Sequence, residues 1–191
     1  MMENYSCILV DPPWSYRVYD ASDAAHGAAR SHYDTQKVDV IQSLPIHALA
    51  AKDCALCMWA TFPCLEEARQ LMQAWGFTYK TALFVWVKLN KDGSPFLGLG
   101  HYSRANAEVC LLGTKGHVKR LAKDVPQVIM SRRRQHSRKP DEQYERIMRL
   151  FKGPYIEMYG RQQWPGWDVW GNQSGKFHAQ PFLFSESEGA A

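Results

Sequence analysis

The chain has 191 residues, of which 46% are hydrophobic and 22% charged, and its formal net charge is +4. These values are ordinary for one soluble globular domain, with a core large enough to need no metal or disulfide. The longest nearly apolar stretch, residues 54–62, is far shorter than the roughly 20 residues of a membrane span, and no secretory signal is visible. We therefore expect a cytoplasmic protein with no membrane partner.

Hydrophobic periodicity predicts alternating strands and helices. The expected strands are residues 6–10, 54–60, 78–87, 107–112, 125–130 and 155–159. The expected helices are residues 63–75 and 140–151, with one or two short helices in residues 38–51 interrupted at Pro45. Two sets of apolar residues each share one helix face: Leu65, Ala68, Met72 and Trp75, then Tyr144, Ile147, Met148 and Phe151. This alternation predicts an α/β fold with a mainly parallel sheet, which binds its ligand beyond the carboxyl ends of the strands.

Two long loops and a tail interrupt this pattern. Residues 15–36 and 89–106 contain few regularly spaced apolar positions, and long loops in compact domains usually serve function. Residues 1–173 are expected to form a single domain. Residues 174–191 are expected to be a partly disordered tail.

The five cysteines are expected to be buried hydrophobic side chains in a reducing compartment. Four of them lie within apolar runs, where free cysteine behaves as a small hydrophobe. Cys54 and Cys57 form a C-x2-C pair without a matching second pair, and residues three apart on a strand face opposite sides. The histidines do not cluster at ligand spacing either. We therefore assign no metal site.

Positive charge is concentrated in residues 115–139, which contain nine Lys or Arg residues and one acidic residue, Asp124. This segment carries +8, so the rest of the chain carries −4 of the total of +4. A basic segment on an otherwise acidic body favours a polyanionic partner, most simply nucleic acid. A solvated basic loop is the alternative interpretation.

The tetrapeptide Asp11-Pro12-Pro13-Trp14 directly follows the first expected strand. Asp11 offers a carboxylate, the prolines present the Pro12 carbonyl in a rigid frame, and Trp14 offers a flat aromatic face. Two acceptors beside a stacking surface suit the exocyclic amino group of a planar base. A turn with a tryptophan packed beneath it is the alternative.

A series of motifs, which starts with this tetrapeptide, resembles the MT-A70 family of adenine N6-methyltransferases. The series covers roughly residues 6–173: V-D-P-P-W (10–14), W-V-K (86–88), G-H-Y (100–102), E-V-C-L-L-G-T-K-G (108–116), H-S-R-K-P-D-E-Q-Y (136–144), I-E-M-Y-G-R (156–161) and P-G-W-D-V-W-G-N-Q (165–173). The resemblance implies a Rossmann-like fold with permuted motif order. It also implies S-adenosylmethionine as cofactor and the amino group of adenine as methyl acceptor.

The resemblance further implies roles for individual residues. The implied catalytic residues are Asp11, Pro12, Pro13 and Trp14: the first two hold the adenine amino group and Trp14 packs at or against the base. The implied cofactor-binding residues are Asp11, Pro12, Lys139, Glu157, Tyr159, Arg161, Asn172 and Gln173. Among these, Lys139 is the partner of the methionine carboxylate, and Asn172 and Gln173 hydrogen-bond the ribose.

The expected substrate-binding residues come from two sources. Tyr16 and Tyr33 lie in the loop after the catalytic motif, and Glu108 matches an acidic residue of the family near the acceptor. The other source is a run of arginines, Arg132, Arg133, Arg134 and Arg138, which leads directly into Lys139. The basic segment therefore runs up to the expected active site, where a nucleic-acid backbone would have to pass.

DNA is the expected nucleic acid, because the zinc fingers and RNA-binding extensions of larger family members are not found in this short chain. An RNA adenine methyltransferase, a catalytically silent nucleic-acid-binding subunit and a cytosine methyltransferase are the alternatives. A homodimer is one possible arrangement, because a chain this small could need a second copy to bind a DNA duplex. The chain departs from larger members in two places: few residues precede Asp11, and Gln162-Gln163-Trp164 replaces a His-Asn pair that touches ribose.

Overall fold

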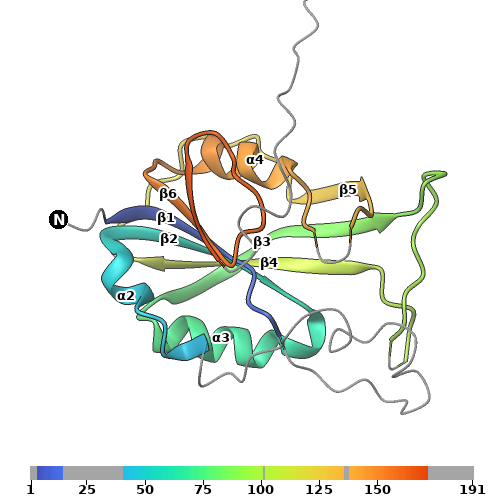
Figure 1. The fold of residues 1–191 in the computed structure, drawn as a ribbon, viewed down its shortest axis with the longest axis horizontal. Helices are drawn as coiled ribbons and strands as arrows, with labels where there is room; N and C mark the ends of the chain where they lie inside the picture. Colours follow the sequence, from blue (N-terminus) through green and yellow to red (C-terminus); the bar gives the residue numbers. More distant parts are fainter. Residues whose placement is uncertain (1–3, 15–40, 101, 136–137, 172–191) are drawn as a thin grey trace, which may run out of the picture.

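A seven-stranded sheet forms the centre of the computed structural model, which describes residues 4–14, 41–100, 102–135 and 138–171 (Figure 1). The strands are β1 (Tyr5–Val10), β2 (Ala50–Ala60), β3 (Thr78–Leu89), β4 (Ala107–Lys115), β5 (Val128–Arg132), β6 (Tyr155–Met158) and β7 (Trp167–Trp170). The helices are α2 (Ile46–Leu49), the 3-10 helix η3 (Phe62–Cys64), α3 (Leu65–Ala74) and α4 (Glu142–Leu150).

The strand order is β5-β3-β4-β2-β1-β6-β7. β1 runs parallel to β2 and β6, β6 to β7, and β3 to β5, whereas β4 is antiparallel to both of its neighbours. Every strand of this sheet except β4 therefore runs in one direction, which confirms the predicted mainly parallel α/β fold. The carboxyl ends of β1, β3, β5 and β6 consequently lie along one edge of the sheet, where a ligand is expected.

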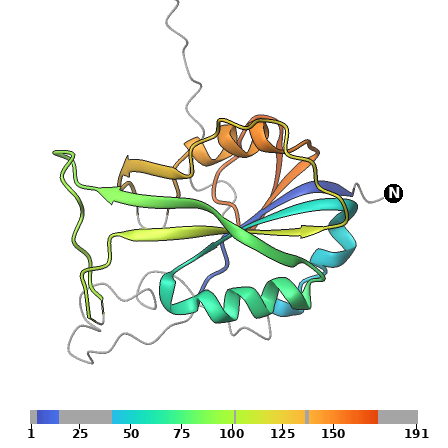
Figure 2. The same ribbon diagram turned by 180° about the vertical axis from the view of Figure 1, so that it is seen from behind.

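The two central strands, β1 and β2, are buried on both faces. On one face, Ile8, Val10, Leu56 and Met58 pack with side chains of α2 and α3. On the other, alternate residues such as Leu9 pack with side chains of α4. The result is a three-layer arrangement, with α2 and α3 below the sheet and α4 above it in Figure 1 (Figure 2 shows it from behind). Continuous apolar runs are what strands covered on both faces require.

All five cysteines are buried and free. Cys54 and Cys57 belong to the cores on opposite faces of β2, as the period of a strand requires. Burial raises the pKa of the Cys54 thiol to about 12, so it stays protonated at neutral pH.

Four local features differ from the sequence prediction. β2 begins at Ala50, where a helix was expected to continue. β5 starts three residues later than expected, at Val128. β6 ends one residue earlier than expected, because Tyr159 has a φ of 62°, outside the extended region. β7 was not predicted at all: it is four residues long and pairs with β6 alone among the described strands.

The apolar face of α4 is also rotated relative to the prediction. Met148 is 37% exposed, whereas Leu150, Gln143 and Arg146 are buried. Arg146 is retained in the interior because its guanidinium donates to the carbonyls of Pro126 and Val128 and to Glu142.

None of the helices within the described ranges is both long and apolar enough to cross a bilayer.

Candidate active site

The Asp11-Pro12-Pro13-Trp14 turn lies at the carboxyl end of β1, on the edge of the sheet where a ligand is expected. The backbone N–H of Trp14 donates to the Pro12 carbonyl at 2.8 Å. The Trp14 indole N–H donates to the carbonyl of Trp59 at 2.8 Å, and the side chain is only 5% exposed. Trp14 is thus packed in the core beneath the turn. It fixes the shape of the motif and does not present an open stacking face.

Asp11 is the first member of a row of alternating charges. The Nζ of Lys139 lies 2.7 Å from Oδ2 of Asp11 and 3.2 Å from Oε2 of Glu108. The ammonium group of Lys88 donates to the other oxygen of Glu108. The four side chains come from the end of β1, the segment before α4, the start of β4 and the end of β3. Folding therefore brings together residues as far apart in sequence as 11 and 139.

The charges in this row give its two carboxylates, Asp11 and Glu108, different pKa values. Burial raises the pKa of Glu108, but the neighbouring ammonium groups of Lys139 and Lys88 outweigh it and hold the value at about 2. Burial raises the pKa of Asp11, and Lys139 only partly offsets that rise. For Lys139 the two carboxylates outweigh burial, so its pKa is raised and it stays charged. Glu108 is thus a permanent anion, and Asp11 is the more easily protonated of the pair.

A third carboxylate, Glu157 on β6, lies in the same site without a hydrogen-bonded cation in the described residues. Its Oε2 accepts a hydrogen bond of 2.8 Å from the Tyr144 hydroxyl, and the side chain is 7% exposed. Burial raises the pKa of Glu157 to about 8, although the hydrogen bond from Tyr144 opposes the rise. Gly160 makes room for this carboxylate, since a Cβ at Gly160 would lie 2.8 Å from Glu157 Oε2.

A polar network connects Glu157 with the segment that carries Lys139. The Gln162 amide donates to the Tyr144 hydroxyl at 3.2 Å and to Asp141 Oδ1 at 2.8 Å, and it accepts from Arg138 at 2.8 Å. The Arg134 guanidinium donates to both oxygens of Asp141 and, at 2.7 Å, to the carbonyl of Lys139. Although burial raises the pKa of Asp141, these donors outweigh it and lower the pKa.

Two of the arginines expected to bind substrate, Arg134 and Arg138, therefore have partners within the protein. The other two, Arg132 and Arg133, are exposed at the end of β5. The Arg133 guanidinium lies 3.6 Å from the centre of the Phe96 ring.

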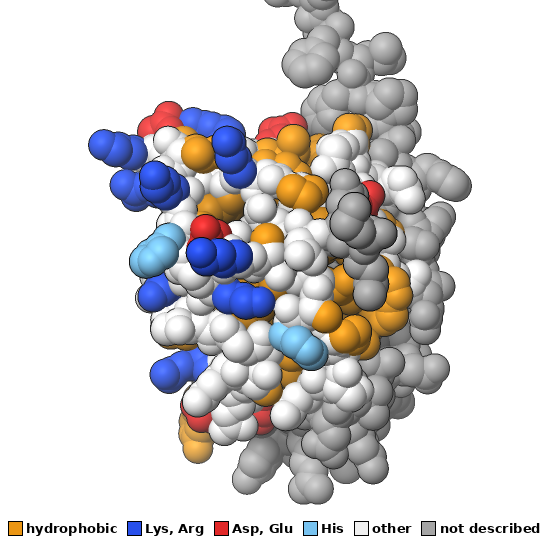
Figure 3. All heavy atoms as spheres, turned by 90° about the vertical axis from the view of Figure 1, so that its left-hand side faces the viewer, with side chains coloured by type: hydrophobic (Ala, Val, Ile, Leu, Met, Phe, Trp, Pro, Cys, Tyr) orange, Lys and Arg blue, Asp and Glu red, His pale blue; other side chains and the backbone are white. Residues whose placement is uncertain are grey.

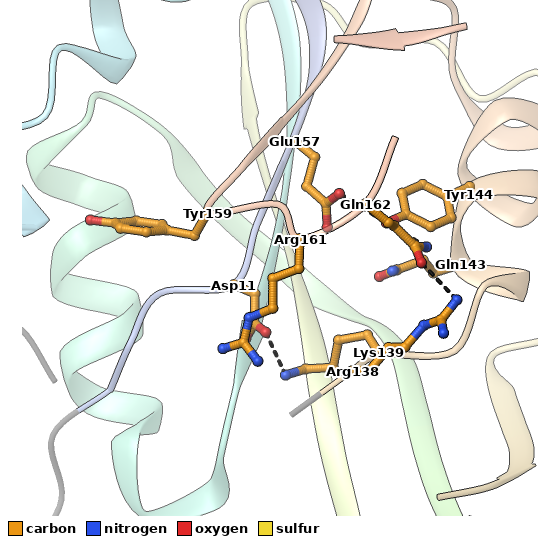
Figure 4. Close-up of a pocket in the computed structure, with 9 residues that line it drawn as sticks. All are labelled: Asp11, Arg138, Lys139, Gln143, Tyr144, Glu157, Tyr159, Arg161 and Gln162. Carbon is orange, nitrogen blue, oxygen red and sulfur yellow. Dashed lines mark hydrogen bonds and ion pairs between the residues drawn. The ribbon is translucent and has the colours of Figure 1, made fainter. Parts of the chain in front are cut away.

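A pocket opens between these groups (Figure 4). Its lining comprises Asp11, Arg138, Lys139, Gln143, Tyr144, Glu157, Tyr159, Arg161 and Gln162. The guanidinium of Arg161 is drawn beside Asp11, and the Tyr159 ring points away toward the other side of the turn. The Tyr159 ring contacts the Trp170 ring edge-on, with 5.6 Å between the ring centres. Tyr159 also has a left-handed backbone conformation, and such residues are often found at functional sites.

The structure thus places Asp11, Glu108, Lys139, Glu157, Tyr159 and Arg161 at one site. Four other expected site residues, Tyr16, Tyr33, Asn172 and Gln173, lie outside the described residues.

Sequence reasoning missed four polar residues that the fold brings to the site: Trp59, Asp141, Gln143 and Gln162. Asp141 and Gln143 lie within the quoted H-S-R-K-P-D-E-Q-Y motif, so their proximity to Lys139 was a usable signal. Gln143 accepts a hydrogen bond of 2.6 Å from the Trp59 indole, beneath the Lys139 ammonium group. Gln162 was noted only as part of the Gln162-Gln163-Trp164 replacement, and the local sequence could not reveal its network, because its partners Arg138, Asp141 and Tyr144 come from other segments.

Comparison with known proteins agrees with this geometry. The family model MT-A70 matches residues 5–173. The chain is 33% identical over 186 residues to the type II methyltransferase M.MunI of Mycoplasma sp, across 88% of this chain and 77% of that protein. It is 30% identical over 183 residues to the N(6)-adenosine-methyltransferase MT-A70-like protein of Drosophila melanogaster, across 91% of this chain and 27% of that protein.

A third relative is the N(6)-adenosine-methyltransferase catalytic subunit METTL3 of Homo sapiens, which is 29% identical over 188 residues, across 93% of this chain and 30% of that protein. The chain thus spans most of M.MunI but less than a third of the two animal proteins. An α/β sheet with a D-P-P-W turn at its ligand-binding edge and methyltransferase relatives defines the class: a methyltransferase. Within that class, the chain belongs to the MT-A70 family.

Proposed function

We propose that this protein transfers a methyl group from S-adenosylmethionine to the N6 amino group of adenine in DNA. The observation that carries the proposal is the position of Asp11. Its carboxylate stands at the carboxyl end of β1, is held by Lys139 at 2.7 Å and borders a pocket lined by charges of both signs. Membership of the MT-A70 family supports the reaction class.

The donor set of the pocket fits S-adenosylmethionine. The methionine part of the cofactor is a zwitterion, and the pocket offers acidic side chains (Asp11, Glu157), whose oxygens accept hydrogen bonds, as well as cations (Lys139, Arg161). An ammonium group has three donors, and Asp11 and Glu108 engage two of those of Lys139, which leaves one for the cofactor carboxylate. Tyr159 and Arg161 are assigned to the nucleoside part, and Asn172 and Gln173 to the ribose. The bound cofactor supplies an electrophilic methyl group.

Asp11 positions the acceptor and responds to its charge. Its carboxylate accepts an N–H of the adenine amino group and so fixes the direction of the nitrogen lone pair. The Pro12 carbonyl has a second lone pair besides the one that Trp14 engages, and it accepts the other N–H. Positive charge develops on the nitrogen as the new bond forms, and the Asp11 carboxylate stabilises that charge in a partly desolvated site. No strong general base is required, because the surplus proton leaves after the transfer.

The choice of DNA rests on the relatives. Among the three relatives named above, the one matched over most of both lengths is a bacterial type II methyltransferase, whereas the two N(6)-adenosine methyltransferases are matched over less than a third of their lengths. An RNA adenine methyltransferase is the alternative, and the names of the latter relatives favour it. The presence of Asp11 argues against a silent nucleic-acid-binding subunit.

The test is methyl transfer from labelled S-adenosylmethionine to duplex DNA, single-stranded DNA and RNA, with the products separated as nucleosides. We expect N6-methyldeoxyadenosine. N6-methyladenosine alone would assign the enzyme to RNA, and cofactor binding without any product would favour the silent subunit.

Asp11→Ala is the matched variant for this assay. We expect turnover to fall at least about 100-fold, as is typical when a preorganised electrostatic group is removed. Calorimetry should show a much smaller loss of cofactor affinity, because the other groups that line the pocket remain. The control is Asp124→Ala, which removes an exposed carboxylate that pairs with Arg149 of α4 and should retain activity. If Asp11→Ala kept most of its activity, the role assigned to Asp11 would be wrong.

A further inference from the structure

An arm leaves the sheet at the carboxyl end of β3 and returns to start β4. We define this β3–β4 arm as the described part of residues 90–106. It extends away from the body of the domain beyond the ends of β3 and β5 (Figures 1 and 2). It therefore projects from the same edge of the sheet that carries Asp11.

The arm has a defined shape, because its own backbone groups hold it together. The N–H of Phe96 donates to the carbonyl of Lys88 at 2.9 Å, and the N–H of Gly98 donates to that of Ala105 at 2.9 Å. A Cβ at Gly98 would lie 2.5 Å from the Ala105 carbonyl oxygen, so only glycine lets the two limbs approach this closely.

The outer part of the arm presents apolar side chains to solvent. Leu97 is 68% exposed, Leu99 is 50% exposed and Tyr102 is fully exposed. None of the three belongs to either core of the domain as the structure describes it. Exposed apolar residues this close together in the chain, on a projection held by its own hydrogen bonds, indicate a surface that contacts a partner.

Cations flank these apolar residues. The Arg133 guanidinium packs on the Phe96 ring. The backbone N–H of Arg133 donates to the carbonyl of Leu89 at 3.0 Å, so the end of β5 is joined to the base of the arm. Two more arginines are exposed: Arg104, which belongs to the arm, and Arg132, which ends β5. Exposed apolar side chains with arginines beside them are complementary to nucleic acid: the apolar side chains suit the stacked bases, and the arginines suit the phosphates.

The base of the arm is also part of the active site. Lys88 lies near the end of the strand that enters the arm, Glu108 lies at the start of the strand that leaves it, and the two form an ion pair. Glu108 continues through Lys139 to Asp11. A nucleic acid that contacts the arm therefore lies next to the reacting groups.

We propose that the β3–β4 arm opens duplex DNA at the target adenine: Leu97, Leu99 and Tyr102 enter the base stack, and Arg104, Arg132 and Arg133 contact the flanking phosphates. This inference rests on the proposed function. The physical reason is that the N6 group of a paired adenine is stacked and hydrogen-bonded, and an enzyme acting on it takes the base out of the helix. Apolar wedges between base steps are a known means of unstacking a duplex.

The test compares one plasmid DNA in its native form and after heat denaturation. In the variant Leu97→Ser, Leu99→Ser, Tyr102→Ser, we expect the methylation rate on native DNA to fall about tenfold or more, because the cost of unstacking a base step is no longer offset by the inserted side chains. On denatured DNA the rate should stay within about twofold of wild type, because no stack remains to be opened. The control is Leu121→Ser, an exposed leucine outside the arm that is 54% exposed and should leave both rates unchanged.

Three results would overturn the inference. Equal loss of rate on both forms of DNA would mean that the arm shapes the active site, and no loss on either would mean that it has no role. A change from dimer to monomer in light scattering on substitution would make the arm an interface between two copies of this chain. Failure of the proposed function is distinguishable, since it would show as no transfer by the wild-type protein to denatured or native DNA.

Discussion

Three carboxyl groups within one site have pKa values that the fold moves in different directions. Glu108 lies between two lysines and has a pKa of about 2, whereas Glu157 is buried against a tyrosine and has a pKa of about 8. Asp11 has a raised pKa because burial outweighs its interaction with Lys139. Carboxyl groups separated in this way take different roles. Glu108 is ionised and faces the ammonium group of Lys139, whereas Glu157 is largely protonated near pH 7.

The raised pKa of Glu157 makes the stability of the protein depend on pH. In the unfolded chain this carboxyl ionises near pH 4.5, and in the folded protein near pH 8. Between these values the folded state holds a proton that the unfolded state has lost, so the free energy of unfolding falls as pH rises. We expect Glu157→Gln to remove this contribution and to raise stability at pH 8 relative to wild type, with a much smaller difference at pH 5.

Urea denaturation of both proteins at pH 5, 6.5 and 8 checks this expectation. A neutral glutamine still accepts the hydrogen bond from Tyr144, so the packing of the site is retained. Glu145→Gln, an exposed glutamate on the same helix as Tyr144, is the control and should follow the wild-type pH dependence. An equal shift of Glu157→Gln at all three pH values would contradict a raised pKa.

At the scale of elements, the segment between β5 and α4 is held by charge-assisted hydrogen bonds. Arg134 donates to both oxygens of Asp141 and to the carbonyl of Lys139, and Gln162 donates to Asp141 from the segment after β6. Asp141 is thus the residue that fixes the backbone of Lys139 relative to two neighbouring segments. Its lowered pKa means that it is ionised at neutral pH.

We expect Asp141→Asn to lower the free energy of unfolding at pH 7 by about 2 kcal/mol, because hydrogen bonds to charged groups are worth about 1.5–3 kcal/mol each. Since Lys139 loses its support, kcat should also fall several-fold while the KM for DNA changes less. Denaturation and steady-state kinetics measure the two effects. Asp124→Asn, which weakens an exposed ion pair with Arg149, should change neither appreciably. A fall in stability with unchanged kcat would mean that Asp141 has no influence on Lys139.

The sequence predicted those elements whose signal is local. β1, β2 and α3 were found because an apolar run or a period of 3.6 identifies a buried strand or an amphipathic helix. β7 was missed because four residues that pair with one neighbour carry too little periodicity. The apolar face of α4 was placed wrongly at Met148, because Arg146 is buried by acceptors on other segments, which no periodicity reveals.

The candidate site was predictable only through its motifs. The D-P-P-W turn and the later motifs identified Asp11, Lys139 and Glu157, although the hydrogen bond from Lys139 to Asp11 spans 128 positions in sequence. The motifs did not reveal that Trp14 faces the core. They also gave no indication that Arg134 and Arg138 bind within the protein. These outcomes depend on the neighbours that folding supplies.

At the scale of the whole molecule, the basic segment divides into two parts. Its first part lies opposite the active-site edge: Lys115 contacts the carbonyl of His47, and the backbone of Leu121 bonds to that of Leu150. Figure 3 shows lysines and arginines gathered on this face. Its second part, from Arg132 onward, lies at the active-site edge. The four arginines expected to bind substrate, Arg132, Arg133, Arg134 and Arg138, all belong to this second part.

This division predicts which charges control binding to nucleic acid. Each neutralised phosphate releases counterions, so the slope of log affinity against log salt changes by about 1 for each phosphate that the protein no longer neutralises. We expect Arg132→Ala, Arg133→Ala to reduce that slope by about 2 and to weaken binding. Arg134 is kept in this variant, because it supports Lys139. Fluorescence anisotropy of labelled duplex DNA at several salt concentrations measures the slope.

The triple variant Lys119→Ala, Arg120→Ala, Lys123→Ala separates direct binding from total charge. It removes three exposed charges from the opposite face, one more than the double variant removes. If overall charge governed binding, the triple variant would weaken binding more than the double variant. Since counterion release requires direct contact, we expect its salt slope to stay at the wild-type value. A slope that falls in both variants would mean that the nucleic acid reaches both ends of the domain, as wrapping or a second copy of the chain would allow.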